Sequence, residues 1–314
     1  MQSDGFLKQT ARKIFENEKN NLHNVMVLFP NRRAIRFFFE YLKEFSISEQ
    51  QKQTSNVQYQ TSNVNFFVPE IFSIDEMVVN SMNDFQKGEN LELLYMLYTV
   101  YCEVMTGKAN TVNSNTSTDG NKDVTQNYEN IETFDEFYFW GNIILNDFDQ
   151  IDKELVDAKA LFRNLEEYKN LEADPSGYLT KEQIELVNRL FNTSLDKDNS
   201  SMRKNFVKIW NCLYEIYDRF NELLDANHLA YSGKMYREFA KRLENGEISL
   251  SCGKIKVIGF SVLNNVEKKI FRLLKENYDT DFYWDYDEYY SKTKVMRREF
   301  SCVKILSYSR KVKI

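Results

Sequence analysis

Two short apolar runs, one near each end of the chain, limit its fold more than any other feature. Val25–Phe29 is followed at once by Pro30, and Ile255–Phe260 carries one charged residue, Lys256. Continuous apolar runs of about five residues are typical of strands that are covered on both faces, as in a parallel sheet. Because a helical pattern follows each run, the two ends of the chain predict one α/β sheet.

The helix expected after the first run has one apolar stripe at helical spacing. Its members are Ala34, Phe37, Phe38, Tyr41, Leu42 and Phe45. A second short strand is expected at Phe66–Val68. Ser73 and Glu76, three residues apart, have the form of a capping box, which predicts a helix that starts at Ser73. After the second run, Val266–Leu274 predicts a helix and Asp281–Trp284 a final strand.

The middle of the chain has a different pattern. Leu91–Met105, Phe134–Ile151 and Phe206–Leu224 keep helical spacing, and nothing between about 90 and 245 resembles a strand. The Asn-, Thr- and Ser-rich segment at about 107–130 predicts disorder. We therefore expect an α/β part over residues 1–88 and 251–290, a helical part over 89–250, and a separate tail over 291–314.

The charge of the chain is unevenly distributed. A net charge of −6 would be unusual for a free-standing nucleic-acid binder. Residues 292–314 hold eight basic residues and one acid, which leaves 33 basic and 46 acidic residues, or −13, for residues 1–291. A reading-frame shift near Ser291 is one hypothesis for this atypical tail. Resequencing the source DNA around that codon tests this hypothesis. An intact frame, with no family-like continuation in another frame downstream, would contradict it.

Several classes of protein do not fit the sequence. No apolar run approaches the roughly 20 residues that a membrane span needs, and no secretory signal pattern opens the chain. The four cysteines are far apart and form no C-x-x-C pair, and the chain has two histidines. We therefore expect neither a disulfide framework nor a zinc site, no other cofactor, and a cytoplasmic location.

The sequence lacks the parts of a nucleotide-hydrolysing site. A phosphate-binding loop needs a glycine-rich turn after a strand and a lysine that reaches the phosphates. The first apolar run leads instead into Pro30–Arg33, which contains no glycine, and the first acid after Val257 is Glu267. With no residue to hold magnesium at the end of that strand, we expect no ATP hydrolysis.

Three groups of carboxylates were considered as metal sites of a nuclease. They are Asp147, Asp149 and Asp152; Asp281, Asp285, Asp287 and Glu288; and Glu267 with Lys269. Their composition also fits a solvated helix face, a strand end with its turn, and a helix N-terminus, and these interpretations are favoured. His23 and His228 do not support a nucleophilic pair. No catalytic residue and no metal ligand is assigned.

Arg32, Arg33 and Arg36 are the best binding candidates. They begin a helix directly after a strand, at the carboxyl edge of the expected sheet, where α/β proteins place ligands. Arginine beside the amides of a helix N-terminus can hold a phosphate. Arginine in the first helical turn is also slightly unfavourable next to the positive end of the helix dipole, and binding of a ligand would explain its presence there. The alternative interpretation is ordinary surface charge.

Six segments, in this order along the chain, resemble the N-terminal half of bacterial PD-(D/E)XK-family proteins similar to the AddB subunit of AddAB-type helicase–nucleases. They are Val25–Ala34, Phe67–Glu76, Phe134–Asp152, Leu155–Leu165, Val257–Leu263 with Glu267, and Phe282–Tyr290. The resemblance covers nearly all of residues 1–290. The stretch through Trp140 and Asp147 is the most specific.

The resemblance implies an inactivated superfamily I helicase fold, with a RecA-like core and a large helical subdomain inserted into it, that acts in double-strand-break repair. Pro30–Arg33 falls where related helicases touch single-stranded DNA, so Asn31 joins the three arginines as a DNA-binding candidate. Gly259 and Phe260 fall where an active helicase carries its magnesium-holding acids. A second helicase half and a nuclease domain are expected beyond this chain.

Taken together, the sequence predicts a non-enzymatic scaffold with no membrane contact. Its partners would be an AddA-like helicase–nuclease subunit and, weakly, single-stranded or double-stranded DNA ends. Two other functions stay open. One is a purely structural interaction module without DNA contact, which the acidic body favours. The other is a metal-dependent nuclease that uses Asp281, Asp285 and Asp287.

Overall fold

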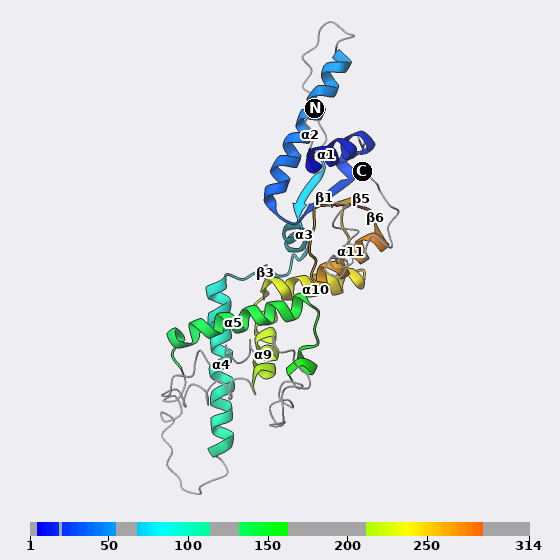
Figure 1. Ribbon diagram of the computed structural model, residues 1–314. Coiled ribbons are helices and arrows are strands. Elements are labelled where there is room, and N and C mark those ends of the chain that lie inside the picture. The colour runs from blue at the N-terminus through cyan, green and yellow to red at the C-terminus, as the bar shows by residue number, and fades with distance from the viewer. Residues whose placement is uncertain (1–4, 19–20, 55–67, 114–131, 163–211, 285–314) are drawn as a thin grey trace, which may run out of the picture. The chain divides into compact units, whose positions relative to one another are not determined.

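The computed structural model describes residues 5–18, 21–54, 68–113, 132–162 and 212–284 (Figure 1). The chain divides into two compact units. One unit, which we call the α/β unit, is formed by residues 1–86 and 234–314. The other, the helical unit, is formed by the residues between them, 87–233.

A four-stranded parallel sheet forms the centre of the α/β unit. Its strands are β1 (Val25–Phe29), β2 (Glu70–Ser73), β5 (Lys254–Ile258) and β6 (Asp279–Tyr283), in the order β2-β1-β5-β6. Phe29 lies opposite Ser73, and Ile258 lies opposite Tyr283, so the strands end at one common edge. The predicted α/β class with a parallel sheet is confirmed at this level.

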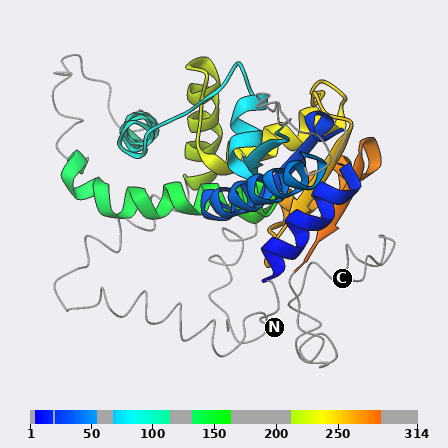
Figure 2. The ribbon, with the colours of Figure 1, turned by 90° about the horizontal axis from the view of Figure 1, so that it is seen from above.

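Helices cover both faces of the sheet (Figures 1 and 2). On one face, α1 (Phe6–Glu18) and α2 (Arg32–Thr54) pack against the side chains of Val25, Val27 and Phe29. On the other face, Phe271 of α11 (Asn265–Asn277) lies edge-on to Phe282, with ring centroids 6.0 Å apart. Burial on both faces explains why every residue of β1 is apolar and buried.

The second strand lies later than the sequence predicted. Of the predicted strand Phe66–Val68, Phe66 and Phe67 lie outside the described residues, Val68 belongs to no strand, and β2 begins at Glu70. The expected capping box is confirmed at the start of α3 (Ile74–Ser81). There the Ser73 amide donates to the Glu76 carboxylate over 2.8 Å, and the Glu76 amide donates back to the Ser73 hydroxyl over 3.3 Å.

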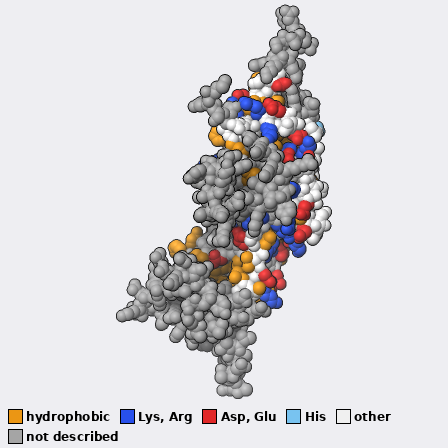
Figure 3. Space-filling view, turned by 45° about the vertical axis from the view of Figure 1, so that its right-hand side comes forward, with side chains coloured by type: hydrophobic (Ala, Val, Ile, Leu, Met, Phe, Trp, Pro, Cys, Tyr) orange, Lys and Arg blue, Asp and Glu red, His pale blue; other side chains and the backbone are white. Residues whose placement is uncertain are grey.

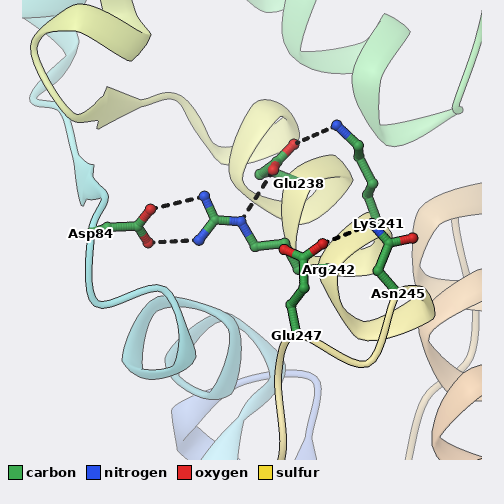
Figure 4. Close-up of polar contacts among 6 residues, drawn as sticks. All are labelled: Asp84, Glu238, Lys241, Arg242, Asn245 and Glu247. Atoms are coloured by element: carbon green, nitrogen blue, oxygen red, sulfur yellow. Dashed lines mark hydrogen bonds and ion pairs between the residues drawn. The ribbon is translucent and has the colours of Figure 1, made fainter.

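The helix α10 (Ser232–Glu244) falls almost wholly within the α/β unit, whereas the sequence-based boundary at 250 left it in the helical part. Figure 4 shows one reason: Arg242 donates two hydrogen bonds of 2.8 Å to the carboxylate of Asp84 and one of 3.1 Å to Glu238. The hydrogen bonds to Asp84 raise the pKa of Arg242. This pairing fastens α10 to the segment that follows α3.

The helical unit contains α4 (Asn90–Asn113), α5 (Phe134–Lys153) and α9 (Leu213–Ala226), and Figure 2 looks along α4. Aromatic side chains fill its core, where the rings of Phe148 and Tyr217 meet edge to face at 5.0 Å. The short strands β3 (Gln86–Lys87) and β4 (Leu229–Ala230) pair with each other. The prediction that no strand occurs between about 90 and 245 is therefore wrong, because β4 lies within that range.

Asp152 differs from the solvated residue that the sequence suggested. Its side chain is buried, and its two carboxylate oxygens accept hydrogen bonds from Tyr217 over 2.7 Å and from Tyr231 over 2.5 Å. Burial and the neighbouring carboxylate raise the pKa of Tyr231. Asp152 therefore ties α5 to α9 and to the residue after β4, inside the core.

Two other expectations have a structural counterpart. No helix among the described residues is long and apolar enough to cross a membrane. The three described cysteines, Cys102, Cys212 and Cys252, form no disulfide with one another. Most of the segment expected to be disordered, the residues 206–211 and the basic tail lie outside the described part of the chain.

Candidate nucleic-acid interface

The strand order of the α/β unit reverses beside β1. The strand β1 pairs in parallel with β2 on one side and with β5 on the other, and β6 follows beyond β5. Open α/β sheets bind ligands at such a switch point, beyond the carboxyl ends of the strands. Pro30 and Asn31 follow β1 at this point, and Gly259 follows β5 with φ of +74°, a value that glycine tolerates.

Asn31 serves as the cap of α2. Its side-chain oxygen accepts hydrogen bonds from the amides of Arg33 over 3.1 Å and of Ala34 over 3.4 Å. These are amides that a helix N-terminus would otherwise offer to an anion. A phosphate at this helix end would therefore have to displace the Asn31 side chain.

Arg32 forms an ion pair with Glu76. Its Nε lies 2.7 Å from a carboxylate oxygen of Glu76, the residue that closes the capping box of α3. Burial acts to raise the pKa of Glu76, but the hydrogen bonds from Ser73 and the charge of Arg32 outweigh it and lower that pKa. The pair joins the residues that follow β1 to those that follow β2.

The helix that follows β5 is capped in the same way. The Glu267 amide donates to the Asn264 side chain over 2.8 Å, and the Asn264 amide donates to the Glu267 carboxylate over 3.0 Å. Glu267 is the first acid along the chain after β5, and its carboxylate is used for the cap. The helices α2, α3 and α11, which begin beyond the ends of β1, β2 and β5, therefore each have at least one N-terminal amide bonded to the side chain of the residue just before the helix.

Arg33 and Arg36 differ from Arg32. Both side chains are exposed, and neither forms an ion pair or a hydrogen bond with another described residue. Phe37 lies one helical turn beyond Arg33 and is 59% exposed. The exposed start of α2 thus combines two unneutralised guanidinium groups with an accessible aromatic ring, and we call Arg33, Arg36 and Phe37 the basic face of α2.

The exposure of Phe37 was not foreseen from the sequence. Its spacing placed it in the apolar stripe, but Phe38 and Leu42 are fully buried and define the centre of the packed face. A helix turns by about 100° per residue, so the ring next to Phe38 along the chain lies near the boundary of that face. The exposure of Phe37 could have been predicted from its angular position around the helix, but not from its being an apolar residue.

Where the structure describes the carboxylates considered as metal sites, most of them have other partners. Among the described residues, no three His, Cys, Asp or Glu side chains are placed to hold a metal ion. Asp149 accepts a hydrogen bond from the Gly233 amide over 2.6 Å and pairs with Lys153 at 2.6 Å. Lys269 bonds to Glu244, away from Glu267. Asp285, Asp287 and Glu288 lie outside the described residues.

A buried lysine in β5 was missed by the sequence analysis. Lys256 is 3% exposed, and its ammonium group lies 3.0 Å from Glu18 of α1 and 2.6 Å from Asp281 of β6. Burial acts to lower the pKa of Lys256, but these two carboxylates outweigh it and raise the pKa. Asp281 is thus neutralised by Lys256 rather than free to hold a metal. A single charged residue inside an apolar strand was the available signal.

Comparison of the chain with models of protein families and with curated proteins finds no match to either. The resemblance to AddB-like proteins therefore rests on the residues quoted for it.

Proposed function

We propose that the α/β unit is a RecA-like core without a motor, interrupted by the helical unit as an inserted subdomain. In this proposal the chain is the non-hydrolysing N-terminal part of an AddB-like protein in double-strand-break repair. It holds one DNA strand by its phosphates and assembles with an AddA-like helicase–nuclease subunit. The resemblance of the sequence segments and the parallel sheet with a switch point at β1 support this proposal.

The basic face of α2 carries the DNA part of the proposal. Arg33 and Arg36 bear full positive charges that no described residue neutralises, at the edge of the sheet where this architecture binds ligands. Guanidinium groups bind phosphate oxygens through paired, charge-assisted hydrogen bonds. The exposed ring of Phe37 adds a surface on which one base can stack.

This arrangement favours holding a strand over hydrolysing a nucleotide. At the helix N-termini beyond β1, β2 and β5, the side chains of Asn31, Ser73 and Asn264 already accept hydrogen bonds from amides that a triphosphate would compete for. Contacts to phosphates alone carry no sequence information. We therefore expect binding that is weak, independent of sequence and steeply dependent on salt.

The test is binding of a fluorescently labelled oligothymidylate to the full chain, followed by anisotropy at several salt concentrations. Each phosphate contact to a single strand contributes about 0.7 to the slope of log affinity against log salt. We expect Arg33→Ala combined with Arg36→Ala to weaken binding and to lower the magnitude of this slope by about 1.4, as two contacts would.

The matched control is Lys241→Ala combined with Arg272→Ala. These two side chains are exposed, belong to the same unit, and make only long ion pairs of 3.9 and 4.0 Å on their own helices. The control changes the net charge by the same amount. Equal loss of binding in both double variants, or an affinity that does not change with salt, would remove the basic face of α2 from the proposal.

Of the alternatives, a role in protein binding has a specific observation in its favour. Apolar and aromatic side chains of α4 and α5 are exposed in the helical unit. This surface differs in chemistry from the basic face of α2, so protein binding through it is compatible with the DNA contact.

A further inference from the structure

An exposed apolar surface lies on α4 and α5 of the helical unit, and we call it the aromatic face. Its members share large apolar side chains that reach the surface of one pair of neighbouring helices. They are Leu91 and Tyr95 (both 61% exposed), Tyr138 (40%), Phe139 (79%) and Ile143 (62%), with the partly buried Phe134 between the helices. In Figure 3 hydrophobic and acidic side chains stand next to each other on the lower part of the visible face.

Ring contacts make the aromatic face continuous. The rings of Tyr95 and Phe134 lie 5.8 Å apart, those of Phe134 and Tyr138 lie 6.3 Å apart, and those of Tyr138 and Phe139 lie 5.9 Å apart. A hollow of about 550 Å³ opens beside these rings and is lined by Leu91, Tyr95, Phe134 and two glutamates. The face therefore offers both an apolar ridge and a recess.

The charge around the aromatic face has one sign. Glu89 and Glu92 line the hollow, and Asp135 is exposed on α5. None of the three forms an ion pair with another described residue. Residues 90–106 of α4 and 134–150 of α5 contain six acidic residues and no lysine or arginine. An anionic ligand such as DNA would be repelled here, whereas a cationic ligand would be attracted.

We propose that the aromatic face binds a basic amphipathic helix of a partner protein. The apolar side chains of that helix would pack on Phe139, Tyr138 and Tyr95 and into the hollow, as an amphipathic helix fills an apolar groove. Its lysine and arginine side chains would pair with Glu92 and Asp135. Rigid aromatic side chains are the residues that most often carry the free energy of such interfaces.

A second copy of this chain fits the face less well. A symmetric dimer through the aromatic face would place the same surface of each copy against the other. Glu92 and Asp135 of each copy would then meet carboxylates, which costs free energy unless cations intervene. The charge of the face thus selects a partner with a different, basic surface.

The test uses the full chain and two synthetic helical peptides of about 18 residues with the same leucine and phenylalanine face. One peptide carries lysine and arginine on its polar face, and the other carries glutamate. We expect the basic peptide to bind in a calorimetric titration and the acidic peptide not to bind. Phe139→Ser should weaken binding of the basic peptide at least about tenfold, because it removes the most exposed ring of the aromatic face.

Three further variants test whether peptide binding is specific to the aromatic face. Phe37→Ser changes an aromatic residue of comparable exposure on the α/β unit and should leave peptide binding unchanged. Glu92→Gln combined with Asp135→Asn should weaken binding and reduce its dependence on salt, because it removes the charge and keeps the shape. Arg33→Ala with Arg36→Ala should not affect the peptide, which separates this proposal from the DNA contact.

Several results would overturn the proposal. They are no binding of the basic peptide at high micromolar concentration, equal binding of both peptides, or equal effects of Phe139→Ser and Phe37→Ser. Self-association of the chain in sedimentation, abolished by Phe139→Ser, would assign the face to a second copy instead.

Discussion

The basic face of α2 and the aromatic face of α4 and α5 are built from the same two ingredients, an exposed aromatic ring and uncompensated charge. On α2 the charge is positive, from Arg33 and Arg36, and on the helical unit it is negative, from Glu92 and Asp135. A ring can stack on a base or pack against an aliphatic side chain with similar ease. The sign of the neighbouring charge therefore decides which ligand each surface takes.

The interiors of the two units also differ in the groups that surround a buried carboxylate. The α/β unit buries a carboxylate, Glu18, against the ammonium groups of Lys254 and Lys256, at 2.9 and 3.0 Å. The helical unit buries its carboxylate, Asp152, against the hydroxyl groups of Tyr217 and Tyr231. An ammonium group brings a full positive charge to the carboxylate, whereas a phenol hydroxyl donates a hydrogen bond without one. The two units should thus respond differently to loss of a partner.

The largest effect is expected from Lys256→Met. Breaking a buried ion pair by removing one partner costs roughly 3–5 kcal/mol, and the cost here should lie near the low end because Glu18 keeps Lys254. A loss of about 3 kcal/mol corresponds to a hundredfold faster amide exchange through opening of the unit. Hydrogen–deuterium exchange should show this acceleration in β1 and β5 and leave α4 and α5 unchanged.

The control for this prediction is Lys254→Met. Lys254 is 33% exposed and leaves Glu18 paired with Lys256, so the acceleration should be clearly smaller. Equal acceleration in the helical unit would show that the two interiors do not respond separately. No acceleration anywhere would mean that the ion pairs of Lys256 contribute nothing to stability.

A crossed substitution of the two exposed rings should have the next largest effect. Loss of one stacked base costs about 1–3 kcal/mol, so Phe37→Ala should weaken oligothymidylate binding about tenfold. Phe139→Ala should leave DNA binding unchanged and weaken the basic peptide instead. Anisotropy with both ligands on both variants measures all four combinations. If either substitution weakened the binding of both ligands equally, the assignment of DNA to the basic face of α2 and of the peptide to the aromatic face would be wrong.

Phe37 also shows which features of the fold could be predicted from the sequence alone and which could not. The strand Val25–Phe29 and the capping box at Ser73 were predictable because each depends on neighbours along the chain. The face that a residue such as Phe37 presents depends on where the neighbouring α1 lies, and this is a tertiary property. Local pattern therefore identified the helix α2 but overestimated its buried stripe.

The candidate site was predictable in place but not in detail. The position of the arginines after β1 followed from the strand–helix junction, whereas the ion pair of Arg32 with Glu76 joins the first turns of two separate helices, α2 and α3. The burial of Asp152 and the pairing of Lys256 likewise depend on partners that lie far away along the chain. Charge alone could not distinguish a solvated carboxylate from one held inside the core.

The smallest effect, and the one most specific to the α/β interior, concerns pH. Burial acts to raise the pKa of Glu18, but hydrogen bonds from Lys254 and Lys256 outweigh it, so the pKa in the folded chain lies below its ordinary value. The unfolded chain then binds a proton more readily than the folded one. The stabilisation is present above the unfolded pKa and is lost as the pH falls through the folded pKa.

Glu18→Gln removes this titration, so the difference in free energy of unfolding between the native chain and the variant should shrink as the pH falls. Urea denaturation at about pH 7, 5 and 3 measures the difference across the range in which a carboxylate titrates. Glu16→Gln, at an exposed position of the same helix, corrects for the general loss of a negative charge. A Glu18→Gln difference that stays constant into acid would mean that the carboxylate of Glu18 gains nothing from its two lysines.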